Sequence, residues 1–140
     1  MNIRAKQSGF TLIELVITIA IIAILASIAY PSYLNYIYES RRTDGLAALS
    51  TAQLALERCY SQNFSYAATC SSLPAFPITS SQGFYTITLS NLGVSTYTLT
   101  ATPQGAQAHD STCASISLNQ ANVKTAQDSS GTDEAKCWNP

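Results

Sequence analysis

A long apolar run near the start of the chain limits the folds that are open to it. Between Phe10 and Tyr30 most residues are apolar, and a predominantly apolar run of about 20 residues is what an α-helix needs to cross a bilayer. Arg4 and Lys6 stand before the run, and basic residues at that position keep the N-terminal end of a spanning helix in the cytoplasm. We therefore expect one membrane-crossing helix, with the rest of the chain exported.

The small residue that could mark a cleavage site lies before this run. A conventional secretory signal has its small-residue site after the apolar core, whereas here Gly9 directly precedes Phe10. Cleavage between these two residues would remove only the basic leader, residues 1–9, and leave the apolar helix on the product.

Glu14 places a carboxylate inside the apolar run. A charge within a spanning helix costs on the order of 3 kcal/mol, so such carboxylates usually have a function. One interpretation is that Glu14 lies near the interface and reaches water. We favour a partner, because an unpaired buried charge is costly. The amino group that cleavage would free at Phe10, in the same subunit or in a neighbour, is the obvious candidate.

The N-terminal motif resembles the class III signal of type IV pilins. The segment GFTLIE at positions 9–14 is followed by the apolar run and by YPSY at positions 30–33. The resemblance implies that prepilin peptidase cleaves after Gly9, that the Phe10 amino group is methylated, and that Glu14 sets the register of assembly. Pseudopilins of secretion systems carry the same signal, so it identifies the superfamily only.

Helical periodicity continues beyond Pro31. Apolar residues recur at helical spacing and predict one helix from Phe10 to about Tyr60, roughly 75 Å long. They are Leu34, Ile37, Leu46, Leu49, Leu56 and Tyr60. We expect bending or local unwinding at Pro31 and Gly45, either as a flexible point of a filament or as a tolerated kink. Residues 10–40 would protrude as a hydrophobic filament-core helix, and residues 41–140 would form the rest of the helix and a globular head.

The second half of this helix is expected to have polar faces, because it carries charged residues: Glu39, Arg41, Arg42, Asp44, Glu57 and Arg58.

Beyond Cys59, alternating segments at 83–89, 97–101 and 114–118 predict strands, with a weaker signal at 123–126 and a turn at 91–93. The predicted fold class is α+β, a long N-terminal helix packed on a small antiparallel sheet.

The head adds a second resemblance, to minor pilins of the PilE type. It is carried by residues 57–66, 96–103 and 118–120 together with Cys113 and Cys137-Trp138. At position 122 that group often has glycine where this chain has Asn122. Asparagine tolerates positive φ better than other non-glycine residues, so we expect the turn to be kept.

Four cysteines in an exported domain favour two disulfides, with three pairings open. The pairs that we expect are Cys59–Cys70 and Cys113–Cys137, the second in the manner of the D-region bridge of pilins. Zinc is the alternative, but no cysteine pair has the short spacing of a zinc site and the chain has one histidine. We expect neither a metal nor a cofactor.

Catalysis and nucleic-acid binding find little support. His109-Asp110 is expected to be a solvated turn, and no phosphate-binding loop is present in the sequence. Beyond Cys59 the basic residues are Lys124 and Lys136, and four acidic residues outnumber them, while DNA binding needs several cations against phosphates. Arg58, Lys124 and Lys136 are the candidates for weak DNA contacts.

Taken together, the sequence predicts a structural subunit of a bacterial type IV pilus, most like a minor pilin, and no enzyme. The subunit would wait in the inner membrane with its head in the periplasm and then join an extracellular filament for adhesion, twitching motility or DNA uptake. Its partners would be other pilins, prepilin peptidase and the inner-membrane assembly machinery. The alternatives are a ComP-like DNA-binding pilin of natural transformation, a major pilin and a type II secretion pseudopilin.

Overall fold

The computed structural model describes residues 9–68, 70 and 73–140, and they divide into two compact units at Asn35 and Tyr36. One helix, α1 (Leu12–Asn63), supplies residues to both units. It is α-helical at Pro31 and at Gly45, so the expectation of local unwinding at these positions is wrong. A proline φ fits the helix, and within 52 residues one missing N–H donor does not interrupt it.

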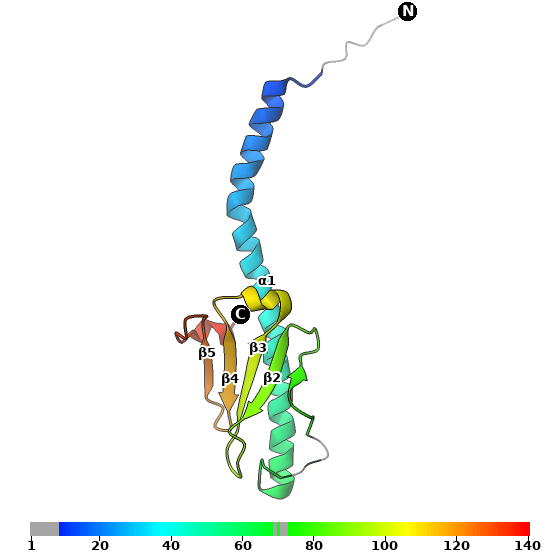
Figure 1. Cartoon of the computed structure of the whole chain (residues 1–140), viewed down its shortest axis with the longest axis vertical. Coiled ribbons are helices and arrows are strands. Elements are labelled where there is room, and N and C mark those ends of the chain that lie inside the picture. Colours follow the sequence, from blue (N-terminus) through cyan, green and yellow to red (C-terminus); the bar gives the residue numbers. More distant parts are fainter. Residues whose placement is uncertain (1–8, 69, 71–72) are drawn as a thin grey trace, which may run out of the picture. The chain divides into compact units, whose positions relative to one another are not determined.

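The second unit contains a five-stranded antiparallel sheet with its strands in chain order (Figure 1). The strands are β1 (Ile78–Thr79), β2 (Tyr85–Ser90), β3 (Thr98–Pro103), β4 (Ser115–Asn119) and β5 (Lys124–Gln127). Two short 3₁₀ helices, η1 (Gly105–His109) and η2 (Ala135–Trp138), follow β3 and β5. The α+β prediction and the four predicted strands are confirmed. Strand β1 was missed because two residues are too few to show alternation.

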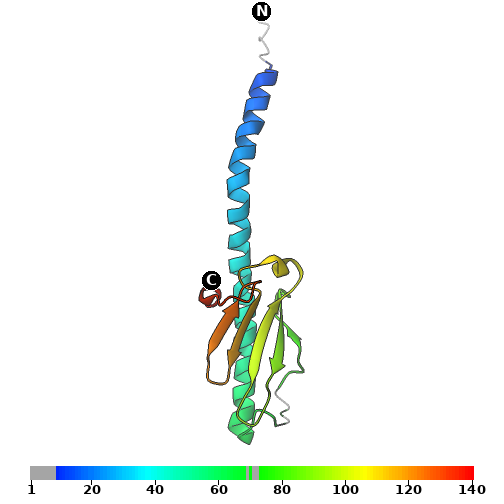
Figure 2. The ribbon, with the colours of Figure 1, turned by 60° about the vertical axis from the view of Figure 1, so that its left-hand side comes forward.

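The core of the second unit lies between α1 and one face of the sheet (Figure 2). Alternate residues of the strands point inward, and Ile87, Leu99 and Ile116 are fully buried against Leu49 and Leu56 of the helix. Burying an aliphatic side chain of this size contributes about 1.5–3 kcal/mol. The helical stripe and the strand alternation in the sequence therefore describe the two sides of one core.

Gly45 brings the helix close to the sheet. A Cβ atom at this position would lie 2.9 Å from carbon atoms of the Tyr85 ring, and Tyr85 is fully buried. The residue is therefore glycine because the ring of Tyr85 occupies the space that a side chain would need. This close contact, rather than flexibility of the helix, accounts for Gly45.

The turn between β4 and β5 confirms the expectation for Asn122. This residue has a φ of 56°, in the left-handed region, and its N–H donates to the carbonyl of Asn119 at 2.9 Å. The Asn119 side chain accepts from the N–H groups of Ala121 and Val123 at 3.0 Å each. Asparagine thus fits this turn, because it adopts positive φ at low cost.

Candidate functional site

The first unit begins with a capping box at the start of α1. Thr11 donates its N–H to a Glu14 carboxylate oxygen at 2.9 Å and its hydroxyl to the same oxygen at 2.7 Å. In return, the Glu14 N–H donates to the Thr11 hydroxyl at 3.3 Å. The spacing Thr-x-x-Glu is the sequence signature of this motif, so Thr11 is a partner of Glu14 that the sequence already indicated and that the N-terminal prediction missed.

Within the first unit, α1 presents apolar side chains on all sides. Every residue from Leu12 to Ile28 is exposed, and by length and composition this part of the helix can cross a membrane. Such a surface needs lipid or other apolar helices around it, since contiguous exposed apolar area of this size marks an interaction surface. Gly9 and Phe10 precede it and are exposed.

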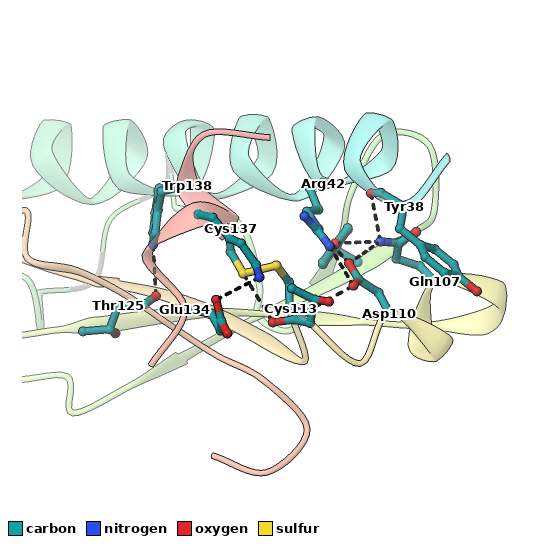
Figure 3. Close-up of a disulfide and its surroundings, with 12 residues drawn as sticks. Tyr38, Arg42, Gln107, Asp110, Cys113, Thr125, Glu134, Cys137 and Trp138 are labelled. Carbon is teal, nitrogen blue, oxygen red and sulfur yellow. Dashed lines mark hydrogen bonds and ion pairs between the residues drawn. A yellow bond between two sulfur atoms is a disulfide. The ribbon is translucent and has the colours of Figure 1, made fainter. Parts of the chain in front are cut away.

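In the second unit, Arg42 of α1 forms a buried ion pair with Asp110, which follows η1 (Figure 3). Its Nε and Nη2 atoms donate to the two carboxylate oxygens at 2.7 and 2.8 Å. Burial disfavours the charged guanidinium, but the hydrogen bond and charge of Asp110 outweigh it and raise the pKa of Arg42. The prediction of a solvated turn is therefore wrong at Asp110, although His109 is exposed.

Gln107 joins this ion pair to the helix and the core. Its Nε2 atom lies within hydrogen-bonding distance of the Tyr38 carbonyl at 3.2 Å, the Tyr85 hydroxyl at 3.1 Å and Asp110 at 3.2 Å. The side chain is fully buried. The Gln107 side chain thus links η1, α1 and β2 at the Tyr38 end of the helix–sheet contact (Figure 3).

Asp44 makes a second polar anchor between α1 and the loop before β2. Its carboxylate accepts hydrogen bonds from the Ser80 and Ser81 hydroxyls and from the N–H groups of Gln82 and Phe84. Burial alone would raise the pKa of Asp44, but these four donors outweigh it and hold the pKa below its usual value. The expected polar faces are therefore wrong for Arg42 and Asp44, which point into the head and connect to distant loops.

Glu57, one turn before the end of the helical stripe, accepts hydrogen bonds from two tyrosines. The hydroxyls of Tyr66 and Tyr97 both lie 3.0 Å from its Oε1 atom. The rings of these tyrosines meet edge to face with centroids 4.7 Å apart. Burial, then the bond to Glu57, raises the pKa of Tyr66 to about 12 and the pKa of Tyr97 further. This cluster closes the end of the core that lies beside the C-terminal end of α1.

Two disulfides close the head, and they are the two pairs that the sequence analysis expected. Cys59 at the end of α1 is bonded to Cys70, and Cys113 before β4 is bonded to Cys137 in η2. The N–H of Cys113 also donates to Asp110 at 3.3 Å, so the second disulfide adjoins the buried ion pair (Figure 3). Among the described residues, no group of three or more His, Cys, Asp or Glu side chains is placed to hold a metal ion.

The three candidates for DNA contacts lie on three different elements. Arg58 is exposed on α1. Lys124 at the start of β5 has its ammonium group 5.0 Å from the centre of the Trp138 ring, and Lys136 in η2 pairs with Glu134 at 3.3 Å. Both lysine side chains remain exposed, and exposed ion pairs of this kind contribute little.

Comparison with known protein families finds two matches that together cover most of the chain. Residues 4–30 match the prokaryotic N-terminal methylation motif. Residues 31–117, more than half of the chain, match the family described as "Type IV minor pilin ComP, DNA uptake sequence receptor".

Individual proteins are also similar to parts of this chain. A segment of 55 residues is 56% identical to the type IV pilus subunit protein TapA of Aeromonas hydrophila, and the match spans 39% of each protein. The non-core minor pilin PilV of Neisseria meningitidis has a similar fold, with a TM-score of 0.55 and 19% identity over 71% of this chain and 96% of that one. A type IV pilin from Shewanella oneidensis aligns with a TM-score of 0.45 and 29% identity over 62% of this chain and 89% of that one.

Proposed function

The chain belongs to the family of type IV minor pilins described as ComP, and from this premise we propose how it is processed and how it enters a filament. As a type IV minor pilin it is a structural subunit that assembles with other pilins. The finer steps proposed here concern its N-terminal residues. The observation that carries them is the exposed apolar surface of α1 from Leu12 to Ile28, headed by the Thr11–Glu14 capping box.

Processing would occur at the junction of Gly9 and Phe10. A prepilin peptidase cuts this bond and the new Phe10 amino group is methylated, which the match to the methylation motif over residues 4–30 supports. The cut would remove Arg4 and Lys6 and leave the helix N-terminus close to Glu14. The subunit is then held in the inner membrane by residues 10–40, with residues 41–140 in the periplasm, until the assembly machinery inserts it into an extracellular pilus.

Glu14 would set the register of the assembled helices. Burial of the aliphatic surface between subunits drives assembly but does not fix the axial position, since apolar contacts are non-directional. A carboxylate in this surface fixes it, because a neighbour's Phe10 amino group is a partner of opposite charge and an unpaired charge is costly. Before assembly the capping box gives the carboxylate two donors from Thr11.

The test replaces Glu14 with valine in cells that make the pilus. Glu14→Val should leave the amount of membrane-inserted subunit unchanged and strongly reduce the amount recovered in sheared filaments. Ile13→Val, at the neighbouring position, is the matched control and should be incorporated normally. Normal incorporation of Glu14→Val would contradict the register function while leaving membership of the pilin family untouched.

A second candidate function is DNA recognition, which the family description itself favours. Arg58, Lys124 and Lys136 would supply the phosphate contacts. Detergent-solubilised full-length protein should then shift duplex DNA at low salt, with affinity falling steeply as salt rises. Each of Arg58→Gln and Lys124→Gln should reduce the log–log salt slope by about 1. Absence of any shift at low salt would remove this candidate.

A further inference from the structure

The outward face of the sheet carries hydroxyl groups in ordered rows. The strand register places Thr88, Thr100, Ser117 and Thr125 side by side across β2, β3, β4 and β5. Thr86 and Thr102 form a neighbouring row. We call these six residues the hydroxyl face. Their side chains point away from the core, because the residues that alternate with them in each strand are its inward-facing members.

Within the five strands the outward positions carry no charged side chain, and Asp133, which pairs with Gln127 beyond β5, places one acidic residue at the edge of this face. All the remaining outward positions of the five strands are threonine, serine, asparagine or glutamine. Strand propensity explains threonine, but it does not explain why lysine, glutamate and arginine are absent from a surface that faces water. Charged residues make up 11% of this chain, against about a quarter of an ordinary domain. The strand positions of this face therefore offer a partner hydroxyl and amide groups in place of charges.

The hydroxyls are already held in place by hydrogen bonds. Ser117 donates to the Thr100 hydroxyl at 3.0 Å, and Thr86 donates to the Gln104 side chain at 2.8 Å. Short side chains on strands also have few rotamers to lose. Binding here therefore costs little side-chain conformational entropy. Because Thr100 accepts the hydrogen bond from Ser117, its own hydroxyl proton stays available to donate to a partner.

Area and charge together narrow the class of partner. With about 4.8 Å between strands and about 6.7 Å between outward residues, the outward side of the sheet covers on the order of 400 Å². A stable protein–protein interface needs about 800 Å² from each partner, so a second copy of the chain is a poor match. DNA is a poor match too, because the face offers no cation to phosphates.

We propose that the hydroxyl face binds neutral polysaccharide. Such a polymer presents hydroxyl donors and acceptors at regular intervals and carries no charge, which matches the rows of Thr and Ser hydroxyls. Its extended chains also match the flat array in a way that a single small ligand does not. This activity goes beyond pilus assembly and is independent of it, because one unassembled subunit contains the whole surface.

The test is co-sedimentation of the full-length protein, kept in detergent, with microcrystalline cellulose. The wild type should sediment with the polymer equally at low and high salt, and soluble hydroxyethyl cellulose should compete. The triple variant Thr88→Val/Thr100→Val/Thr125→Val keeps side-chain shape and removes three hydroxyls, so its binding should fall about tenfold or more. The control Thr43→Val/Thr51→Val, at exposed positions of α1, should bind like the wild type.

A second variant tests the same face independently, in case the triple variant does not fold. Thr100→Lys changes one outward residue and places a charge in the centre of the face, and it should also lose cellulose binding while its thermal midpoint stays near that of the wild type. Cellulose binding by both variants at the wild-type level, or no binding by the wild type, would overturn the proposal. A concentration-dependent dimer that the triple variant abolishes would overturn it as well, since the face would then belong to a second copy.

Discussion

Arg42 and Asp110, 68 positions apart in the chain, form a two-bond ion pair that is almost fully buried, with 6% and 2% of their side chains exposed. The pair fastens α1 to the segment that follows η1. A buried pair is not a large source of stability in itself, because both charges lose hydration. Its importance lies in what happens when one partner is removed.

Replacing Arg42 with methionine should destabilise the head by about 3 kcal/mol, because Asp110 would stay buried without its counter-charge. The measurement is thermal unfolding of the full-length protein in detergent. Arg41→Met is the matched control. Arg41 lies 4.5 Å over the Phe84 ring, and losing a cation–π contact of this kind costs about 0.5–1 kcal/mol. Equal losses for the two variants would show that the buried pair has no special structural role.

Gly45→Ala should destabilise the protein by about 1–3 kcal/mol, since the added methyl group overlaps the Tyr85 ring. Helix propensity alone predicts the opposite sign, a gain of up to about 1 kcal/mol. Thermal unfolding distinguishes these outcomes. In a Tyr85→Leu background the alanine should cost less, and an unchanged cost there would mean that another contact is responsible.

Alkaline pH should unfold the head through its buried tyrosines. The pKa of Tyr66 is raised from 10.0 to about 12, first by burial and then by its bond to Glu57, and burial also raises the pKa of Tyr85 to about 12. The unfolded chain releases these protons near pH 10 and the folded chain holds them. Stability is therefore complete below pH 10 and is lost as pH rises towards 12.

Unfolding midpoints measured across this range should fall, and the fall should be shallower in Tyr66→Phe. Tyr36→Phe, at an exposed tyrosine of the same chain, should keep the wild-type slope. A wild-type midpoint that is flat above pH 10 would contradict the assignment of these hydroxyls as protonated in the fold.

Acid should weaken the anchor at Asp44. Four hydrogen bonds to its carboxylate hold its pKa below the ordinary 3.8, so the folded state favours the ionised form. This stability is present above pH 3.8 and is lost as pH falls below it. Asp44→Asn should lower the thermal midpoint at neutral pH and flatten its decline in acid. An Asn variant with the full acid-induced decline would assign that decline to other carboxylates.

Local sequence patterns were sufficient for the elements of the fold. The alternation around Ile87, Leu99 and Ile116 predicted three strands, and the helical spacing of Leu49 and Leu56 predicted the face of α1 that packs on them. These predictions succeed because inward and outward positions follow directly from the period of each element. Strand β1 lacked such a pattern, since it contains only Ile78 and Thr79.

The polar anchors could not be predicted in the same way. Arg42 and Asp44 look like surface residues of an amphipathic helix, and only the folded chain brings Asp110 and the Ser80 loop to them. The requirement for glycine at position 45 comes from the ring of Tyr85, 40 residues away in the chain, which no local pattern reveals. The Thr11–Glu14 capping box, by contrast, could be predicted from the sequence, because its two residues are three positions apart.

The position of Trp138 gives the protein a built-in optical reporter. It is the chain's one tryptophan, it follows the disulfide-bonded Cys137 directly, and its indole Nε1 donates to the Thr125 carbonyl at 3.0 Å. When the C-terminal segment leaves the edge of the sheet, this indole exchanges a carbonyl partner for water. The wavelength of intrinsic fluorescence therefore reports the docking of that segment, without any label attached to the pilus.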